Sequence, residues 1–397
     1  MATAFDSALS YKALSNAWAK LYSKTKPISR NTIGVDDKSI NDFQIDPKGN
    51  LVRLHKLLSS GEFKFSSLKP YLIPKTNGKK RLICVPTVGD RIVQGAVLDF
   101  LSTKYANVLA NSVSFGFIKG VGVSQAAKRA RELRNKHPYV FKTDITSFFD
   151  SIPREQLTAA IKRVVRDRSL HPLLFEVLSC EVAYNQQNLD DIDALGIKPG
   201  RGLRQGMPLS PFLSNVLLVK FDRRLDKAAL KAVRYADDLI FLCADETECR
   251  RAARFCKEEF AKIGLSIPEI GPGSKSQIYR PGESAEFLGL ELALDNGNYV
   301  LRASKNQIDR MRQAILDLSN MRDVVSRGIS LRTINQILAS KRDGFLGAYV
   351  DCDNHQEVEH ALRQAEVRAL KILFGQGLGI NIKKIGAVGR AFLGIAD

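Results

Sequence analysis

Two adjacent aspartates stand at the tip of an otherwise apolar hairpin. In VRYADDLIFLC, residues 233–243, the runs that flank Asp237 and Asp238 are rich in β-branched and aromatic residues, which is typical of two short strands. Two carboxylates about 4 Å apart repel each other by roughly 4 kcal/mol at an effective dielectric constant near 20. A hairpin that needed only a turn would use Asn-Gly or Asp-Gly. The pair is therefore either well solvated or stabilised by a cation.

A third carboxylate favours the cation. Asp144 ends an expected strand, YVFKTD, and Phe149 follows five residues later. A lone aspartate at a strand end is more often a turn or cap residue, but two-metal phosphoryl transfer needs carboxylates that flank two ions roughly 3.5–4 Å apart. Mg²⁺ prefers such hard oxygen ligands and keeps several of its waters. The sequence therefore predicts that Asp144, Asp237 and Asp238 hold two Mg²⁺ ions, with Mn²⁺ as an alternative.

The chain is strongly basic. Its 397 residues include 60 Lys and Arg against 42 Asp and Glu, a formal net charge of +18. Residues 60–142 alone hold 15 basic and 4 acidic residues, and 15 − 4 = +11. A charge of this size indicates a polyanionic partner, most simply nucleic acid. The basic helix expected over 122–136 supplies the candidate phosphate contacts, which are Lys128, Arg129, Arg131 and Arg134. A merely solvated basic face is the alternative.

Other function classes find little support. The six cysteines include no CxxC pair and the five histidines no HExxH, so no zinc site is indicated and the thiols are expected to be reduced. No apolar run approaches 18 residues, and the first residues lack the apolar core of a signal peptide. We therefore expect a soluble, cytoplasmic protein without a membrane partner.

The hydrophobic pattern predicts the elements that position these residues. A strand–turn–strand with Asn77-Gly78 at its tip is expected over 71–86. A helix should begin at Ser210 as the N-cap with Pro211 at its first position. Further helices are expected over 1–24, 50–61, 90–110, 122–136 and 246–264, and beyond 300 with Ile308, Met311, Ile315 and Leu318 on one face. The middle of the chain is mixed α/β and its last hundred residues are mostly helical.

Five motifs in chain order resemble those of reverse transcriptases. YADD is similar to their catalytic signature, DITSFFDSI to their first aspartate motif, and RQGMPLSPFLSNVLL to their QG…SP…N motif. AEFLGLEL resembles their primer-grip hairpin and KTNGKKRLICVPTVGDRIVQGAV their fingers hairpin. Upstream, NTIGVDDKSINDF and LSSGEFKFSSLKPYLIPK resemble the amino-terminal motifs of the group II intron-like bacterial branch. The resemblance runs from about residue 29 to 292, and GFLGAYVDCDN is similar to the thumb of phage-defence-associated members.

The resemblance implies a fold and a set of site residues. The fold would be a mixed α/β (α+β) right-hand polymerase, with an amino-terminal extension and fingers over 1–140, a palm over 141–298 and a helical thumb over 299–397. Asp144, Asp237 and Asp238 would be the metal ligands. Nucleotide contacts would come from Lys79 and Arg81 on the triphosphate, Phe149 against a ribose 2′-hydroxyl, Gln205 in a flexible loop under the base pair, and Lys275 as a proton donor to pyrophosphate. The primer grip would be Phe287, Leu288 and Gly289.

The implied activity is RNA-directed DNA polymerisation. Its partners would be an RNA template, expected to be a structured non-coding RNA, together with dNTPs and the DNA product. No Cys or His cluster that could build an endonuclease follows the thumb, which favours an antiphage role over a self-sufficient mobile element. Ile118 and Val121 stand where the family often has arginines, so the resemblance implies no arginine contact to the template at these two positions.

Two other functions stay open at this stage. An RNA-dependent RNA polymerase is one, because Asn215 could sense a 2′-hydroxyl, although Phe149 argues against it. An intron-maturase-like RNA-binding protein is the other. The complete set of three aspartates argues that catalysis is used, and no added RNA-binding domain is apparent.

Overall fold

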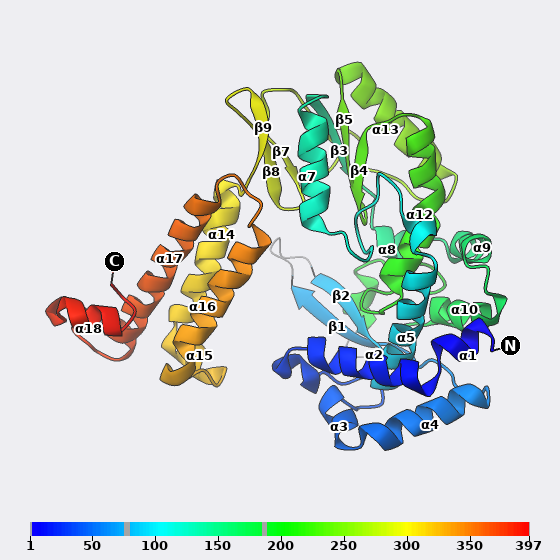
Figure 1. The fold of residues 1–397 in the computed structure, drawn as a ribbon, viewed down its shortest axis with the longest axis horizontal. Helices are drawn as coiled ribbons and strands as arrows, with labels where there is room; N and C mark the ends of the chain where they lie inside the picture. The colour runs from blue at the N-terminus through cyan, green and yellow to red at the C-terminus, as the bar shows by residue number, and fades with distance from the viewer. Residues whose placement is uncertain (1, 75–79, 185–188, 397) are drawn as a thin grey trace. The chain divides into compact units, whose positions relative to one another are not determined.

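The computed structural model describes residues 2–74, 80–184 and 189–396. The chain forms two compact units, each assembled from separate segments (Figure 1). Unit 1 comprises Met1–Ala126, Phe141–Leu242 and Glu246–Ile278, and unit 2 comprises Ala127–Val140, Cys243–Asp245 and Tyr279–Asp397. The expected boundaries at 140 and 298 for fingers, palm and thumb remain a prediction.

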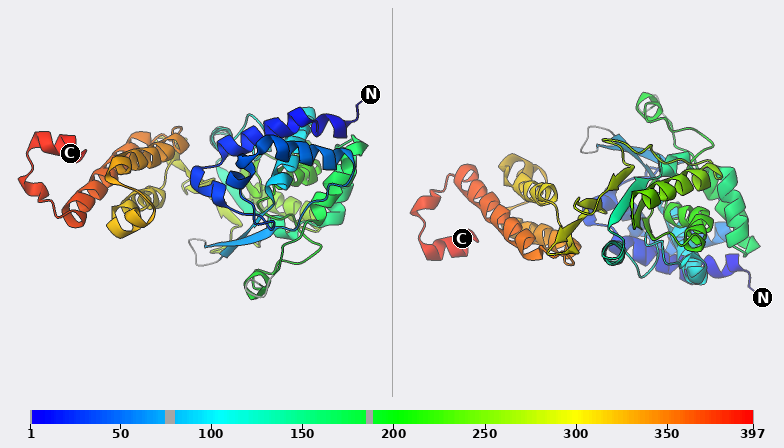
Figure 2. Two further views of the ribbon diagram at one scale, coloured as in Figure 1. Left: turned by 90° about the horizontal axis from the view of Figure 1, so that it is seen from below. Right: turned by 90° about the horizontal axis from the view of Figure 1, so that it is seen from above.

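Helices form the amino-terminal part of unit 1. Hydroxyl or carboxylate N-caps start most of them: Thr3, Ser10, Ser39, Asp46 and Thr87 each accept a hydrogen bond from a backbone N–H of the first turn. Helix α2 packs against α4 and α5 (Figure 2), and its Trp18 ring lies 4.5 Å from that of Phe43. The helices are α1 Ala4–Ala8, α2 Tyr11–Lys24, α3 Ile40–Ile45, α4 Pro47–Ser59, α5 Val88–Lys104 and α6 Ala106–Leu109.

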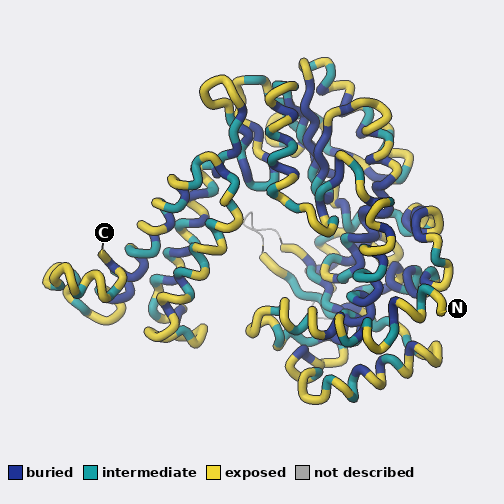
Figure 3. The backbone as a smooth tube through the Cα atoms, viewed as in Figure 1, coloured by how far each residue is buried: buried dark blue, intermediate teal, exposed yellow. Residues whose placement is uncertain are grey.

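A four-stranded sheet carries the three aspartates. Its strand order is β4-β5-β3-β6, with β3 Tyr139–Asp144, β4 Ala232–Tyr235, β5 Asp238–Cys243 and β6 Gln277–Tyr279. Strands β4 and β5 pair antiparallel, which confirms the predicted hairpin. The central strands are largely buried (Figure 3), and the rings of Phe141 and Phe241 stack across β3 and β5 at 5.6 Å. The sheet is thus a rigid platform for its strand ends.

Helices α12, Ser210–Lys227, and α13, Glu246–Ala261, belong to the same core. The rings of Phe221 and Phe260 stack between them at 4.3 Å. The expected N-cap of α12 is wrong by one residue. Leu209 is the N-cap, and the Ser210 hydroxyl instead donates to the carbonyl of Arg204 at 3.0 Å, which ties the preceding loop to the helix. Remaining helices of this region are α8 Phe148–Ser151, α9 Arg154–Val164, α10 His171–Ser179 and α11 Leu189–Asp193.

A separate hairpin precedes α5. Strands β1, Lys69–Pro74, and β2, Lys80–Val85, pair antiparallel with Pro74 opposite Lys80. The expected Asn77-Gly78 tip and Lys79 lie outside the described residues. The backbone N–H of Cys84 donates to the carbonyl of Gln205 at 2.7 Å, so β2 also holds the segment before α12.

Unit 2 contains most of helix α7, which spans Val123–Arg134, together with a three-stranded sheet and a helical bundle. The sheet is β7 Ala285–Phe287, β8 Leu290–Asp295 and β9 Asn298–Arg302. Helices α14 Lys305–Leu316, α15 Met321–Ser326, α16 Leu331–Ala348, α17 His355–Ile372 and α18 Ala387–Phe392 follow. The apolar face expected beyond residue 300 is confirmed, because Ile308, Met311, Ile315 and Leu318 all lie in the bundle core.

All six cysteines are buried free thiols. Among the described residues, no helix combines the length and apolarity needed to cross a membrane.

Asp90 in the first turn of α5 gives a test of the fold. It is 3% exposed and accepts a hydrogen bond from the Ser66 N–H at 3.2 Å, and burial raises the pKa of this carboxyl to about 6. A raised carboxyl pKa contributes stability below the unfolded value near 4 that is lost as pH rises through about 6. At pH 8, Asp90→Asn should therefore unfold at a higher urea concentration than the wild type, and its free energy of unfolding should be greater by about 1–3 kcal/mol. Near pH 4 the two proteins should be equally stable.

The matched control is Asp99→Asn, on the exposed face of the same helix, whose side chain is 44% exposed. It should leave the pH profile unchanged. Parallel urea midpoints for wild type and Asp90→Asn between pH 4 and 8 would contradict the assignment.

Candidate active site

The β4–β5 turn brings the aspartates together. Tyr235 pairs with Asp238, so Ala236 and Asp237 form the two-residue tip. Ala236 has φ +57°, a left-handed conformation that is unfavourable for any residue with a Cβ. The carbonyl of Asp237 accepts a hydrogen bond at 3.1 Å from the N–H of Ile145, the residue after Asp144. The end of β3 is thereby fixed beside the hairpin tip.

Asp144 is buried and only half satisfied. Its Oδ2 pairs with the Lys275 ammonium, while Oδ1 is buried without a hydrogen-bond partner. The hydrogen bond to Asp144 raises the pKa of Lys275, which keeps the ammonium charged. A buried carboxylate oxygen without a donor is costly, so binding of a cation or a hydrogen-bond donor at this oxygen would be favourable.

The ionised forms of Asp237 and Asp238, the two aspartates of the β4–β5 hairpin, are electrostatically unfavourable. Burial raises the pKa of both Asp237 and Asp238, and that of Asp238 to about 6. The negative charge of Asp237 is the next cause for Asp238, whereas Lys142 and Lys275 act in the opposite direction. Such carboxylates would be stabilised in their ionised form by a nearby cation.

These three residues fit Mg²⁺. The described parts of the chain contain no group of three or more His, Cys, Asp or Glu side chains placed so that the group could hold a metal ion. Mg²⁺ does not require such a cage, because it is usually bound by one or two carboxylates, several waters and substrate phosphates. The donors are all oxygens, one of them is orphaned, and an ammonium already occupies a cation position on Asp144.

The candidate nucleotide-contact residues differ in their exposure and in the contacts that they make. Arg81, on β2, is exposed, and its positive charge is the smallest of the causes that act on Asp237, where it lowers the pKa against the effect of burial. Gln205 is half-buried, and its backbone carbonyl accepts the hydrogen bond from the Cys84 N–H of β2. Gly206 has φ +115°, and a Cβ there would overlap the Cys84 carbonyl. Only glycine lets the two backbones meet in this way.

Phe149 is held in place by its backbone. Its carbonyl accepts the Leu203 N–H at 2.7 Å, and a Cβ on Gly202 would lie 2.8 Å from the same oxygen. The ring packs at 5.3 Å from that of Phe148, which is fully buried, whereas Phe149 is half-buried. The Phe149 side chain is thus only partly covered by the protein.

The primer-grip candidates divide into core and turn. Phe287 is 1% exposed and belongs to the interior of unit 2. Leu288 and Gly289 form the β7–β8 turn with φ of +54° and +78°, and both are half-exposed. Phe287 therefore supports the turn, and only Leu288 and Gly289 present surface.

Helix α7 is less available to phosphate than its sequence indicates. The expectation for Arg134 is wrong, because its guanidinium is buried, donates to the carbonyls of Leu292 and Glu283 at 2.6 Å, and stacks on Tyr299. The other three side chains are partly exposed but ion-paired: Lys128 with Asp351, Arg129 with Glu132 and Arg131 with Asp353. Two of these acidic partners are more than 200 residues away along the chain.

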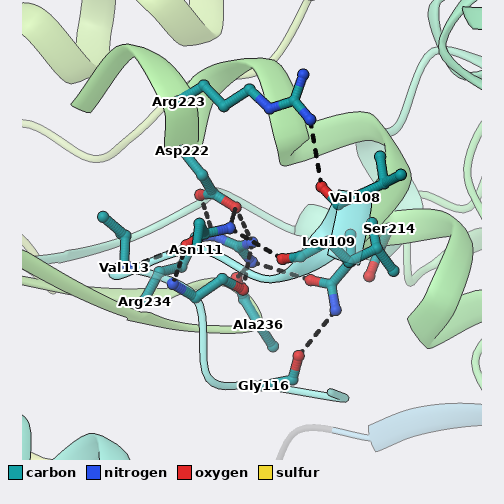
Figure 4. A network of polar contacts seen from close by, with 12 residues as sticks. Val108, Leu109, Asn111, Val113, Gly116, Ser214, Asp222, Arg223, Arg234 and Ala236 are labelled. Atoms are coloured by element: carbon teal, nitrogen blue, oxygen red, sulfur yellow. Dashed lines mark hydrogen bonds and ion pairs between the residues drawn. The ribbon is translucent and has the colours of Figure 1, made fainter. Parts of the chain in front are cut away.

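Sequence reasoning missed a buried network behind the hairpin (Figure 4). Arg234 pairs with Asp222 on α12, and both side chains are 1% exposed. Asn215 accepts from Arg234 at 3.2 Å through Oδ1 and donates to the Gly116 carbonyl at 2.8 Å through Nδ2. Asn215 is thus fully engaged in the interior and is not free to sense a 2′-hydroxyl. The only sequence signal was an arginine inside an apolar strand.

The arrangement matches a known family. Residues 73–292, more than half of the chain, match the family model described as reverse transcriptase (RNA-dependent DNA polymerase). The chain belongs to the reverse transcriptase family. The matched span contains all three aspartates, most of the β1–β2 hairpin and the Arg234 network.

Curated relatives agree with this assignment. The chain is 28% identical to Protein YkfC of Escherichia coli over half of each chain. It is 26% identical to Retron Mx65 reverse transcriptase of Myxococcus xanthus, covering 75% of this chain and 64% of that one. It is also 26% identical to Group II intron-encoded protein LtrA of Lactococcus lactis, covering 64% and 41% respectively. The chain spans about half the length of YkfC and a smaller share of LtrA.

The revised view of α7 can be tested by salt dependence. Replacing Lys128, Arg129 and Arg131 together by Gln should weaken RNA binding and reduce the log–log salt slope by about one unit for each phosphate that is no longer neutralised. Arg134→Met should leave the slope unchanged. It should instead destabilise unit 2 by about 3 kcal/mol, because several buried carbonyls lose their donor.

Fluorescence anisotropy with a fixed RNA between 50 and 300 mM KCl measures the slope, and thermal unfolding measures the stability. A reduced slope for folded Arg134→Met would contradict the structural assignment.

Proposed function

We propose that this protein is an RNA-directed DNA polymerase that adds dNTPs to a 3′-hydroxyl on an RNA template. The observation that carries the proposal is the convergence of Asp144, Asp237 and Asp238 at one end of a buried sheet. The unfavourable charges of Asp237 and Asp238 and the unpartnered Asp144 oxygen suit divalent cations. Membership of the reverse transcriptase family supports the reaction type.

Asp144, Asp237 and Asp238 would hold two Mg²⁺ ions, with Mn²⁺ as an alternative. Bound there, the ions would supply activation of the attacking hydroxyl and neutralisation of the leaving pyrophosphate. Arg81, with Lys79 two residues earlier in the sequence, would clamp the triphosphate, since a planar guanidinium suits phosphate oxygens.

Other residues of the chain would orient the nucleotide. Lys275 stays protonated beside Asp144 and would donate its proton to the leaving pyrophosphate. Gln205, fixed on β2, would lie under the new base pair. The half-buried Phe149 ring would exclude a 2′-hydroxyl from the sugar.

The wider organisation is also part of the proposal. Residues 1–140, 141–298 and 299–397 would act as fingers, palm and helical thumb, with Leu288 and Gly289 against the primer. Lys128, Arg129 and Arg131 would contact a structured non-coding RNA. An antiphage role is supported by the thumb-like motif GFLGAYVDCDN.

The alternatives are less well supported. An RNA polymerase that reads the sugar through Asn215 would need an amide that is not already buried and doubly hydrogen-bonded. A purely RNA-binding maturase has no use for three clustered aspartates, of which Asp237 and Asp238 are unfavourable as charged groups without a cation.

The metal-ligand assignment predicts that Asp237→Asn with Asp238→Asn abolishes DNA synthesis, because neutral amides cannot balance divalent ions. Without metal at pH 8, the double variant should be at least as stable as the wild type, since two half-buried like charges are removed. Primer extension with dNTPs on an RNA template and thermal unfolding measure the two effects. Persistent extension by the double variant would refute the assignment, and Asp245→Asn, just beyond the far end of the strand, serves as the control.

The sugar-exclusion role predicts a change of nucleotide preference. Phe149→Ala should open space for a 2′-hydroxyl, so kcat/KM for GTP should rise relative to dGTP by about 10²–10³, equivalent to roughly 3–4 kcal/mol. Phe148→Leu, a change of a neighbouring core ring, should lower stability without changing the ratio. An unchanged GTP to dGTP ratio in folded Phe149→Ala would mean that this ring only packs.

A further inference from the structure

We propose that Arg234 and Asn215 are positioning residues that hold the catalytic hairpin in its active conformation. The proposal rests on the proposed function of Asp237 and Asp238. It assigns a role to a buried network that no part of that function requires directly (Figure 4).

The guanidinium of Arg234 is completely used. Two donors go to the carboxylate of Asp222, at 2.7 Å from Nε and 2.6 Å from Nη2. The others reach the Asn215 amide oxygen at 3.2 Å, the Ser114 hydroxyl at 2.7 Å and the Ala236 carbonyl at 2.9 Å. Arginine has five N–H donors in a fixed fork, and all five find acceptors here. A lysine could not reproduce this set.

One of these acceptors belongs to the catalytic hairpin itself. The Ala236 carbonyl precedes Asp237, in the residue that has the unfavourable φ of +57°. A strained turn persists only where its surroundings determine it, and the hydrogen bond from Arg234 is the interaction that fixes this peptide. Losing it would let the tip relax and move the two carboxylates.

A second segment, residues 113–116, also packs against the tip. Arg234 exchanges backbone hydrogen bonds with the segment 113–115, at 2.8 Å to the Val113 carbonyl and 2.9 Å from the Phe115 N–H. A Cβ on Gly116 would overlap the backbone N of Ala236, so this glycine lets the segment lie directly against the tip. Asn215 joins the two sides, because it binds both Arg234 and the Gly116 carbonyl.

Charge explains why the arginine has a carboxylate partner. A buried ion pair usually contributes no more to the free energy of unfolding than apolar side chains of similar volume. A gain in stability is therefore a weak explanation for the Arg234–Asp222 pair. Asp222 neutralises Arg234, and the network therefore positions the hairpin without adding net positive charge next to Asp237 and Asp238. Those carboxylates keep their capacity for metal ions.

The test compares Arg234→Met with Leu225→Ala. Leu225 is fully buried on α12, one turn beyond Asp222, and its truncation should destabilise the same region without touching the hairpin. Arg234→Met should lower kcat for dNTP addition about 100-fold, as expected for a displacement of about 1 Å at reacting groups, with KM changed less than about 3-fold. Arg234→Lys should not restore kcat.

A readout independent of turnover is Mn²⁺ binding, measured by electron paramagnetic resonance on the full chain. Arg234→Met should weaken the Mn²⁺ sites that disappear in Asp237→Asn with Asp238→Asn, by about 10-fold, while affinity for an RNA–DNA hybrid stays within about 3-fold. Leu225→Ala should bind Mn²⁺ like the wild type at equal folded fraction. If Arg234→Met loses only as much Mn²⁺ binding and kcat as Leu225→Ala, the network is merely structural and the proposal is overturned.

Ser114→Ala and Asn215→Leu keep the test decisive if Arg234→Met does not fold. Each removes one acceptor of Arg234, and each should reduce kcat and Mn²⁺ affinity in the same direction by a smaller factor. Wild-type values in both folded variants would also overturn the proposal. Failure of the proposed function is distinguishable, because the wild type itself would then lack dNTP addition.

Discussion

Mutual repulsion among Asp144, Asp237 and Asp238 is the constraint on which the rest of unit 1 depends. Burial and the neighbouring negative charges disfavour the ionised forms of Asp237 and Asp238, so the surrounding structure must hold these side chains where unaided folding would separate them. The sheet does so through buried β3 and β5 and through the hydrogen bond from Ile145 to Asp237. Lys275 offsets part of the charge by pairing with Asp144. What remains is a site that favours cations.

Close backbone approach is the second feature that shapes the site. Gly206 lies against the Cys84 carbonyl, Gly202 against Phe149 and Gly116 against Ala236, at distances that exclude a side chain. Each of these contacts joins segments distant in sequence, and each fixes a loop that carries a candidate functional residue. Loops that look flexible in sequence are therefore parts of a packed frame. Their precision comes from glycine, because no other residue lets two backbones pack so closely.

Buried arginines show how charge is redistributed by folding. Arg134, Arg204 and Arg234 are each about 1% exposed or less, and all three are held by carbonyls or carboxylates of other elements. The net charge of +18 thus overstates the positive surface, because part of it is internal or paired. The guanidinium suits such positions, since its fork of donors can join several elements at once. Basic composition indicates the class of partner, but not which residues meet it.

Local periodicity and residue chemistry were enough to predict that the three aspartates lie at strand ends, and to predict the β4–β5 hairpin, most helices and the apolar face that contains Ile308 and Met311. Only the tertiary structure showed that Arg134 is buried, because its hydrogen-bond partners lie far along the chain. Only the structure showed that Leu209 is the N-cap of α12, because this depends on the geometry of the preceding loop. The network of Arg234, Asp222 and Asn215 likewise emerged only from the packed structure. Pairing of buried polar groups depends on which elements pack together, and no local pattern in the sequence encodes that.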